Sequence, residues 1–331
     1  MQGGLIPAAT RSRFLLDWKR LTGSAVADRA LLAVSGGGDS TALLLMFHAV
    51  GGIVTPPVVA TVDHGVREEA ADEARTVAGL CDELGLAHTT LKGELPDRSA
   101  GSANLSARAR DLRYALLHNH AQQVGARWIV TAHHADDQLE TLIMRLNRGS
   151  GVGGLASIRS KSGNVVRPLL TWTRNELQDI VVEADVEVAC DPSNVDDRFD
   201  RARLRQKLKG TDLLDARAAA RSASALAEAN EAIEWSLDAL AKERCRFSPG
   251  WASLNTFWLP AEYQRRLAIR CLRHVDPEIA VRGDELTRLL DALRSDRDAT
   301  LGNVQCSTAV VDQSSPVLAW TFQKAPPRRA N

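Results

Sequence analysis

The segment from Leu31 to Ser40 reads Leu-Leu-Ala-Val-Ser-Gly-Gly-Gly-Asp-Ser, an apolar run that leads into three glycines flanked by polar residues. Glycine lets a backbone turn tightly, so that its N–H groups approach phosphate oxygens, and a following helix adds partial positive charge at its N-terminus. The hydroxyls of Ser35 and Ser40 can donate to phosphate, whereas the Asp39 carboxylate would repel it unless Mg²⁺ lay between them. The segment therefore predicts a phosphate-binding turn. It matches neither G-x-x-x-x-G-K-[ST] nor G-x-G-x-x-G, which excludes a Walker-type kinase and a Rossmann dehydrogenase.

Two further polar clusters follow apolar runs. One reads Val-Asp-His-Gly-Val-Arg over 62–67, and the other reads Thr-Ala-His-His-Ala-Asp-Asp-Gln-Leu-Glu-Thr over 131–141. In an open parallel sheet, ligands bind beyond the carboxyl ends of the strands. We therefore expect all three clusters to meet at one rim of a sheet.

The second of these clusters carries three carboxylates, Asp136, Asp137 and Glu140. Their spacing of three and four residues places them on one helix face, where they can hold a cation jointly. His133, at the expected strand end, is placed to touch phosphate or a developing charge. For His134, both a functional role and an ordinary place in a satisfied rim remain open.

The elements that must position these residues follow from the hydrophobic pattern. Short apolar runs alternate with longer helical stretches over the first two thirds of the chain, which is typical of a parallel sheet wrapped by helices. We expect strands at 31–34, 58–62, 88–91, 128–132 and 165–169, and helices at about 39–50, 67–85, 103–124, 135–147 and 173–184. The predicted fold is an open, mainly parallel Rossmann-like sheet with helices on both faces, followed by a smaller C-terminal α+β domain.

The pattern changes after Gly210 to an Ala-rich helix and then to mixed helices near 260–274 and 283–295. We expect a catalytic domain over 1–210, a helical connector over 211–245, a smaller domain over 246–325 and a flexible tail over 326–331.

Composition narrows the class of protein. With 331 residues, 44% hydrophobic and 25% charged, the chain is an ordinary globular protein, which excludes a disordered or collagen-like one. Lys+Arg 41 balances Asp+Glu 41, so a nucleic-acid partner would have to meet a local basic patch. Five cysteines without a CxxC pair argue against a disulfide framework, a zinc knuckle or an iron–sulfur site. We expect a cytoplasmic protein that is neither exported nor inserted in a membrane, and either a monomer or a homodimer.

The segment 35–40 resembles the pyrophosphate loop S-G-G-x-D-S of the N-type ATP pyrophosphatases. The resemblance implies adenylation of a substrate oxygen, release of pyrophosphate, and displacement of AMP by a nitrogen or sulfur nucleophile. It implies that ATP is bound by Ser35, Gly36, Gly37, Gly38, Asp39, Ser40, Asp63 and His64.

Within that family the chain is similar to the tRNA(Ile)-lysidine synthases. The similarity lies in Asp63-His64-Gly65 with Arg67, Ala109-Arg110-x-x-Arg113-Tyr114, Ala132-His-His-Ala-Asp-Asp137 with Glu140-Thr141, Arg148-Gly149-x-Gly151, Arg167-Pro-Leu-Leu170 and Asp191-Pro-Ser-Asn194. The chain departs from the family pattern at Ala70, usually Ser, and at Arg201-Ala202, usually Arg-Asn. These departures bear on tRNA or lysine contacts near 201–205 and leave ATP use untouched.

The resemblance implies that L-lysine is ligated to C2 of the wobble cytidine of an isoleucine tRNA with a CAU anticodon, which changes codon reading from AUG to AUA. ATP and Mg²⁺ are the implied cofactors. The implied catalytic residues are Asp39, His133, Asp137, Arg110 and Arg113. Asp39 and Asp136 are expected to hold Mg²⁺, and Asp137 and Glu140 to hold lysine.

Charge placement fits an RNA partner. Residues 141–175 carry six basic side chains and no acidic one, and residues 198–209 carry six against Asp200 alone. One such run would be an ordinary solvated helix face, but two that follow a nucleotide-activating site favour phosphate contacts. We expect tRNA contacts from Arg148, Arg167, Arg174, Arg201, Arg205, Lys207 and Lys209. We also expect the smaller domain over 246–325 to contact the tRNA, and there Arg265, Arg266, Arg270 and Arg273 suit tRNA contact and an ordinary amphipathic helix equally well.

Three alternatives remain. A tRNA thiolase or an amidating synthetase would share the loop, but an iron–sulfur thiolase needs clustered cysteines, and amidation needs a glutaminase domain or an ammonia source. Asp63-His64, His133-His134 and Asp136-Asp137 also suit a metal-dependent phosphoesterase, which would need no ATP. A non-catalytic tRNA-binding protein would not need the loop at 35–40.

Overall fold

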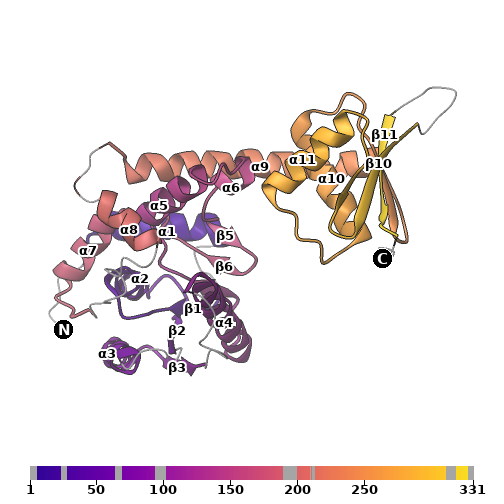
Figure 1. The fold of residues 1–331 in the computed structure, drawn as a ribbon. Helices are drawn as coiled ribbons and strands as arrows, with labels where there is room; N and C mark the ends of the chain where they lie inside the picture. Colours follow the sequence, from indigo (N-terminus) through magenta and orange to yellow (C-terminus); the bar gives the residue numbers. More distant parts are fainter. Residues whose placement is uncertain are drawn as a thin grey trace. The chain divides into compact units, whose positions relative to one another are not determined.

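The structure is a computed structural model that describes residues 6–23, 28–63, 69–93, 102–188, 200–208, 210, 213–310 and 318–326. The chain divides into two compact units, Met1–Glu228 and Ala229–Asn331. Each unit has its own sheet, drawn in Figure 1, and its own hydrophobic core.

The sheet of the first unit is open and mainly parallel, as the sequence predicts. Its strands are β1 (Ala30–Ala33), β2 (Val58–Asp63), β3 (His88–Lys92), β4 (Trp128–Val130), β5 (Lys161–Ser162) and β6 (Val165–Val166). Their order is β3-β2-β1-β4-β6-β5, and only β5 runs antiparallel to its neighbour among these strands. Leu31, Leu32, Val59, Ile129 and Val130 are wholly buried, as expected for strands covered on both faces.

Helices cover both faces of this sheet. They are α1 (Ala8–Thr22), α2 (Gly38–Ala49), α3 (Glu69–Leu84), α4 (Ser102–Gln123), α5 (Ala135–Leu146), α6 (Val152–Leu155), α7 (Arg174–Glu183) and α8 (Asp200–Leu208). Side chains of α1, α2, α3 and α7 share one core, and α4 packs Leu117 and Ala121 into a second core on the other face. Helix α1 is not expected from the sequence. It is held because Phe14 and Trp18, one turn apart, pack edge-on against Phe47 of α2.

Two strands end earlier than the sequence predicts. β4 ends at Val130 and β6 at Val166, instead of at 132 and 169. The polar stretch Thr131–His134 leaves the sheet and leads directly into α5, so these residues lie beyond the strand end, where the expected rim is formed.

The second unit is an antiparallel sheet with helices. Its strands are β7 (Cys245–Ser248), β8 (Trp251–Asn255), β9 (Ala299–Leu301), β10 (Val304–Val310) and β11 (Leu318–Lys324), in the order β7-β8-β11-β10-β9. Helices α10 (Ala261–Val275) and α11 (Gly283–Arg294) pack on it through Leu267, Leu272, Leu286 and Leu290. The predicted smaller α+β domain is therefore present.

Helix α9 (Ala216–Arg244) contributes its first part to one unit and its later part to the other. The limits expected from the sequence, with a connector over 211–245 and a tail over 326–331, remain predictions. The described cysteines, Cys81, Cys245, Cys271 and Cys306, are all free and buried. Within the described ranges, no helix combines the length and the apolar character needed to cross a bilayer.

Candidate active site

The turn between β1 and α2 has the glycine-rich geometry that the sequence predicts. Gly36 has φ of 89°, in the left-handed region that favours glycine. The hydroxyl of Ser40 donates to the carbonyl of Gly37 (2.9 Å) and accepts from the N–H of Ser35 (3.1 Å), which closes the turn on itself. Because α2 begins at Gly38, its unpaired N–H groups and positive end face the mouth of the turn.

Asp39 lies in the first turn of α2 with 38% of its side chain exposed, so it is accessible to a ligand. Beside it stands His134, the residue before α5, of which only 1% is exposed. Nε2 of His134 lies 3.3 Å from Asp39 Oδ2 and 3.6 Å from Asp137 Oδ2. Nδ1 lies 3.4 Å from Asp136 Oδ2, without the alignment of a good hydrogen bond, so that contact is mainly electrostatic.

The charge of His134 follows from these neighbours. Burial by itself lowers the pKa of His134, but the carboxylates of Asp136, Asp39 and Asp137 outweigh it and raise the pKa to about 9. Burial opposes ionisation of Asp136, yet His134 and the backbone N–H of Arg174, which donates at 2.8 Å, bring the pKa of Asp136 down to about 2. At neutral pH an imidazolium therefore sits between ionised carboxylates.

Burial also opposes ionisation of Asp137, but His134 and Arg201 still lower its pKa. Its Oδ2 accepts the backbone N–H of His134 at 3.1 Å, which fixes the carboxylate at the start of α5.

The pKa of His133 is shifted in the opposite direction to that of His134. Burial lowers the pKa of His133 to about 4; Asp137 acts against this shift, and Arg167, Arg110 and Arg201 add to it. Its Nδ1 is hydrogen-bonded to Thr131 Oγ1 at 2.9 Å. Two adjacent histidines on one loop therefore carry different charge at neutral pH, His134 as a cation and His133 as a neutral ring.

Glu140, one turn further along α5, is enclosed by arginines. Its side chain is 4% exposed, and Arg205 donates to both oxygens, at 2.7 and 3.1 Å. Arg201 donates to Oε2 at 3.0 Å and to Thr141 Oγ1 at 3.0 Å, and Arg174 Nη2 lies 4.0 Å from Oε1. The cations at this face of α5 are thus guanidinium groups, two from α8 and one from α7. The two from α8 hold that helix against α5.

The remaining predicted residues are more dispersed. Arg110 stacks over the ring of Tyr114 on α4 at 5.0 Å, and Arg113 is exposed on the same helix. Arg167 is buried and donates to the carbonyl of Arg159 (2.7 Å) and to Tyr114 Oη (3.3 Å). Asp63 ends β2 at the same rim. Arg148 and Lys207 are exposed, and His64 and Lys209 lie outside the described residues.

Sequence reasoning missed two features of this rim. It left open whether His134 has a role, although His134 contacts three of the predicted acidic residues. It also placed Arg174, Arg201 and Arg205 only against tRNA, whereas all three surround Glu140. The i, i+4 spacing of Arg201 and Arg205 was the available signal for a shared carboxylate partner.

The donor set suits a magnesium ion only in part. The exposed Asp39 carboxylate beside a phosphate turn is the hard oxygen ligand that Mg²⁺ takes together with substrate phosphates. Asp136 differs, because its Oδ2 already faces His134 and accepts from Arg174. Among the described residues no group of three or more His, Cys, Asp and Glu side chains has metal-binding geometry.

A parallel sheet with a glycine-rich turn before α2 and carboxylates on the same rim defines a PP-loop protein. The family model of the PP-loop domain matches residues 11–211. Among solved structures, the U34-tRNA thiolase NcsA from Methanococcus maripaludis superimposes with a TM-score of 0.53 at 13% identity, over 66% of this chain and 79% of that one. At this identity the likeness shows the fold alone.

Curated relatives narrow the assignment. A tRNA(Ile)-lysidine synthase from Novosphingobium aromaticivorans is 42% identical over the whole of this chain and 98% of its own length. Another, from Zymomonas mobilis, is 37% identical over 94% of this chain and 93% of its own length. The chain belongs to the tRNA(Ile)-lysidine synthase family, whose members are ATP-dependent ligases.

Proposed function

We propose that this protein ligates L-lysine to C2 of the wobble cytidine in an isoleucine tRNA with a CAU anticodon, converting ATP to AMP and pyrophosphate. The modified base then reads AUA in place of AUG. The observation that carries the proposal is the rim itself, where a phosphate turn, an exposed Asp39 and two histidines of different charge lie together. Full-length similarity to lysidine synthases supports the substrates.

In the first half-reaction the cytosine O2 attacks the α-phosphorus of ATP, and the bond to the pyrophosphate oxygen breaks. The N–H groups at the start of α2 and the hydroxyls of Ser35 and Ser40 would bind the phosphates, and Asp63 and His64 would bracket the nucleoside. Mg²⁺, when bound, would be held by Asp39 with Asp136 nearby and would offset the phosphate charge. His134, whose Nε2 lies 3.3 Å from Asp39 Oδ2, would steady that carboxylate.

In the second half-reaction the lysine ε-nitrogen bonds to C2, and the bond from C2 to the adenylated oxygen breaks, so that AMP leaves. The amine attacks only after its ammonium has lost a proton. Asp137 would hold the ammonium, and the proton would leave to a carboxylate or histidine of the rim. His133, whose pKa is lowered to about 4, is a weak base, and we place it next to the phosphates. Arg110 and Arg113 would steady the activated base or the departing AMP.

The two residues expected to hold lysine, Asp137 and Glu140, differ in the contacts that they already make. Both oxygens of Glu140 already accept from arginines. In Asp137, Oδ2 accepts the backbone N–H of His134, whereas Oδ1 lies 3.7 Å from Arg201 Nη2. We therefore assign lysine binding chiefly to Asp137, with Glu140 keeping Arg201 and Arg205 beside it. For tRNA contact, Arg148 and Lys207 are exposed candidates, and Arg167, Arg174, Arg201 and Arg205 are buried or half-buried ones; Lys209 stays a candidate from the sequence. The protein acts in the cytoplasm, as a monomer or a homodimer.

The test is product analysis. The full chain is incubated with ATP, Mg²⁺, lysine and an isoleucine tRNA transcript with a CAU anticodon, and the digested nucleosides are identified by mass. The expected product is lysidine, formed with lysine and with no other amino acid, in step with AMP. A sulfur-containing base would favour a thiolase, and phosphodiester hydrolysis without ATP would favour a phosphoesterase; either result would overturn the proposal.

A further inference from the structure

Two side chains of helix α1 contact the backbone segment 171–174, which we call the linking segment. Arg13 and Asp17 lie one helical turn apart on α1. The indole Nε1 of Trp172 donates to Asp17 Oδ2 at 3.0 Å, and the Arg13 guanidinium stacks over the same ring, 4.0 Å from its centroid. Arg13 also donates to the carbonyl of Thr171 at 2.9 Å. Helix α1 therefore holds both a side chain and the backbone of the linking segment.

The linking segment in turn holds the first turn of α5. The carbonyl of Trp172 accepts the N–H of Ala135 at 2.7 Å, and the N–H of Arg174 donates to Asp136 Oδ2 at 2.8 Å. The N–H of Ala135 is one of the first four of a helix, which have no partner within the helix itself. Because α5 begins at Ala135, these two bonds fix the start of the helix that carries Asp136 and Asp137.

Both ends of the linking segment are anchored. Before it, Leu169 and Leu170 are buried, and the Leu169 carbonyl accepts the N–H of Trp172 at 2.9 Å. At its other end, Glu176 accepts the N–H of Thr173 at 2.7 Å and caps α7. Trp172 itself is buried between these anchors. The anchors define the path of the segment, and the contacts from α1 hold its indole ring.

The position of α5 decides where its carboxylates lie relative to α2. His134, the residue before α5, has its Nε2 3.3 Å from Asp39 Oδ2 and 3.6 Å from Asp137 Oδ2. A shift of the first turn of α5 would move Asp136 and Asp137 relative to Asp39, whereas the phosphate turn between β1 and α2 would stay in place. Misplacing a substrate-binding group by about 1 Å can cost about a hundredfold in rate.

We propose that Arg13 and Asp17 are positioning residues for the ligation. Through Trp172 they hold the start of α5, so that its carboxylates meet the amine substrate. The inference rests on the proposed function only for the identity of that substrate, L-lysine. The alternative is a role in stability alone, since Arg13 also binds Glu176 and so joins α1 to α7.

A second arginine provides a matched control, because it binds the same carboxylate oxygen. Arg13 Nη1 lies 2.6 Å and Arg217 Nη2 lies 2.8 Å from Glu176 Oε1, and both side chains are partly exposed. Arg13→Gln and Arg217→Gln each remove one ion pair from Glu176. Only Arg13→Gln also removes the contacts with Trp172 and Thr171. A difference between the two variants therefore reports on the linking segment.

The first measurement is the steady-state rate of lysidine formation by the full chain, with lysine and ATP varied separately. Arg13→Gln and Asp17→Ala should raise the KM for lysine about tenfold and change the KM for ATP by less than about twofold. Arg217→Gln should leave both KM values within about twofold. A role in stability alone would lower kcat through loss of active protein and leave both KM values unchanged. That result, or equal effects of Arg13→Gln and Arg217→Gln, would overturn the inference.

Conservative variants guard against a folding defect. Asp17→Asn keeps a side-chain oxygen that can accept from the indole, so it should keep the KM for lysine. Trp172→Phe removes the donor and keeps a ring for Arg13 to cover, and it should raise the KM for lysine as Asp17→Ala does. The double variant should add little to either single change, because the two side chains act as one unit. Additive effects, or an Asp17→Asn variant that behaves like Asp17→Ala, would contradict the inference.

Amide hydrogen exchange tests the placement of α5 without the reaction. In peptides that span residues 131–141, Arg13→Gln and Asp17→Ala should exchange at least about threefold faster than the unaltered protein, and Arg217→Gln should exchange at the unaltered rate. If the unaltered protein makes lysidine while exchange or the KM for lysine stays unchanged in the two α1 variants, the inference fails and the proposed function stands. If it makes none, exchange decides: a rise in those variants keeps the inference while the proposed function fails.

Discussion

Two charged clusters in this molecule are built from the same residue types and serve different ends. At the rim of the first unit, Asp39, Asp136, Asp137 and Glu140 meet histidine and arginine. Between α9 and α10, Glu234, Asp238 and Glu262 meet Arg265, Arg266 and Arg270. Both clusters place acids and bases at helical spacing, so the sequence pattern alone does not separate them.

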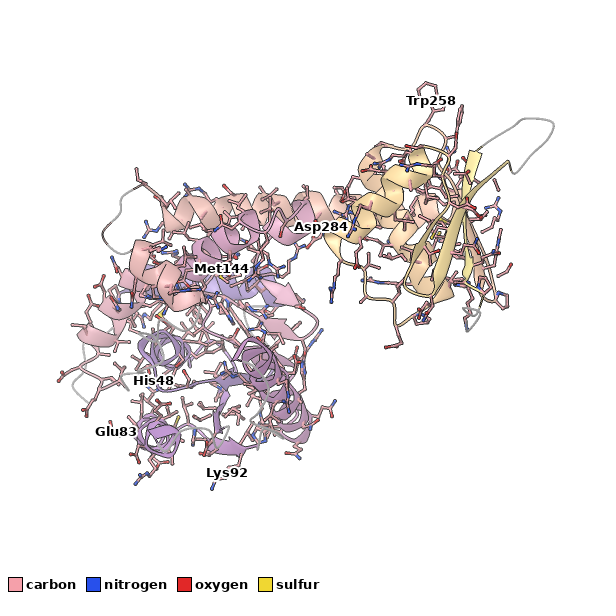
Figure 2. The ribbon with its side chains drawn as sticks, in the orientation of Figure 1. His48, Glu83, Lys92, Met144, Trp258 and Asp284 are labelled. Atoms are coloured by element: carbon pink, nitrogen blue, oxygen red, sulfur yellow. The ribbon has the colours of Figure 1, made fainter. Side chains whose placement is uncertain are left out.

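The two clusters differ in how deeply their side chains are buried and in how far apart the paired residues lie in the sequence. His134 is 1% and Glu140 4% exposed, and the arginines of Glu140 come from about sixty residues further along the chain. The α9–α10 cluster pairs each exposed acid with an arginine, partly within one helix turn, and of its members Arg266 alone is buried. Trp258, on the loop before α10, projects into solvent in the same unit (Figure 2). A buried charge must be matched or used, whereas an exposed pair contributes little.

The largest expected difference is in catalysis. Asp39→Asn should reduce ATP–pyrophosphate exchange in the presence of tRNA by at least about a hundredfold, because the loop loses the carboxylate that would hold Mg²⁺ against the phosphates. Glu262→Gln in the other cluster should leave the exchange within about twofold. The tRNA affinity of Asp39→Asn should be normal. Exchange at the full rate in that variant would show that Asp39 and its loop take no part in the adenylation step.

Next comes the stability of the first unit. Glu140→Gln leaves Arg205, which is 26% exposed, and Arg201, which is 41% exposed and therefore partly screened by solvent, without their carboxylate, at a cost of about 2–3 kcal/mol in the free energy of unfolding. Urea unfolding followed by circular dichroism measures this cost. A change below about 1 kcal/mol would mean that solvent screens this cluster as it does the one on α10.

The third difference is in pH dependence, tested without metal in a chelating buffer. The pKa of His134 is raised to about 9 in the folded protein, above the value of about 6.5 in an unfolded chain. Its contribution is therefore complete below pH 6.5 and is lost as the pH rises through 9, by up to about 3 kcal/mol. His134→Gln should flatten this slope in urea titrations at pH 6 and 9.5. An equal slope in both proteins would contradict the charge assigned to His134.

The smallest effect belongs to the α9–α10 cluster. The arginines that bind Glu262 lower its pKa to about 2, but the side chain is 38% exposed. Glu262→Gln should therefore cost less than about 1 kcal/mol, and 0.5 M salt should reduce even that. Thermal melts at two salt concentrations measure it. A loss comparable to that in Glu140→Gln would erase the distinction between the clusters.

Several elements of the fold could be predicted from the sequence, because a buried strand or helix face requires a local pattern of apolar residues. The apolar run at 58–62 became β2, and the stretch 135–147 became α5, each within about one residue. Helix α1 was not predicted because its apolar residues do not lie on a single face: Phe14 and Trp18 are buried, whereas Leu16 between them is 64% exposed. The short strands of the second unit mix polar and apolar residues, as expected for a sheet with one open face.

The site is predictable only where it is local. The turn at 35–40 and the carboxylates at 136, 137 and 140 lie within single elements, so their types and spacing could be read directly. The i, i+4 spacing of Arg201 and Arg205 indicates a shared carboxylate partner, but that this partner is Glu140 depends on how α8 packs against α5, which no local pattern records. The different charges of His133 and His134 depend on burial and on neighbours from α2 and α5.

The buried cysteines give each unit its own reporter. Burial raises the pKa of Cys81 to about 11 and that of Cys306 to about 12, so almost no reactive thiolate is present at neutral pH. Cys81 lies in the first unit and Cys306 in the second. A thiol reagent will therefore modify each one only when its own unit opens, and peptide mapping of the modified positions will time the two openings independently in one sample.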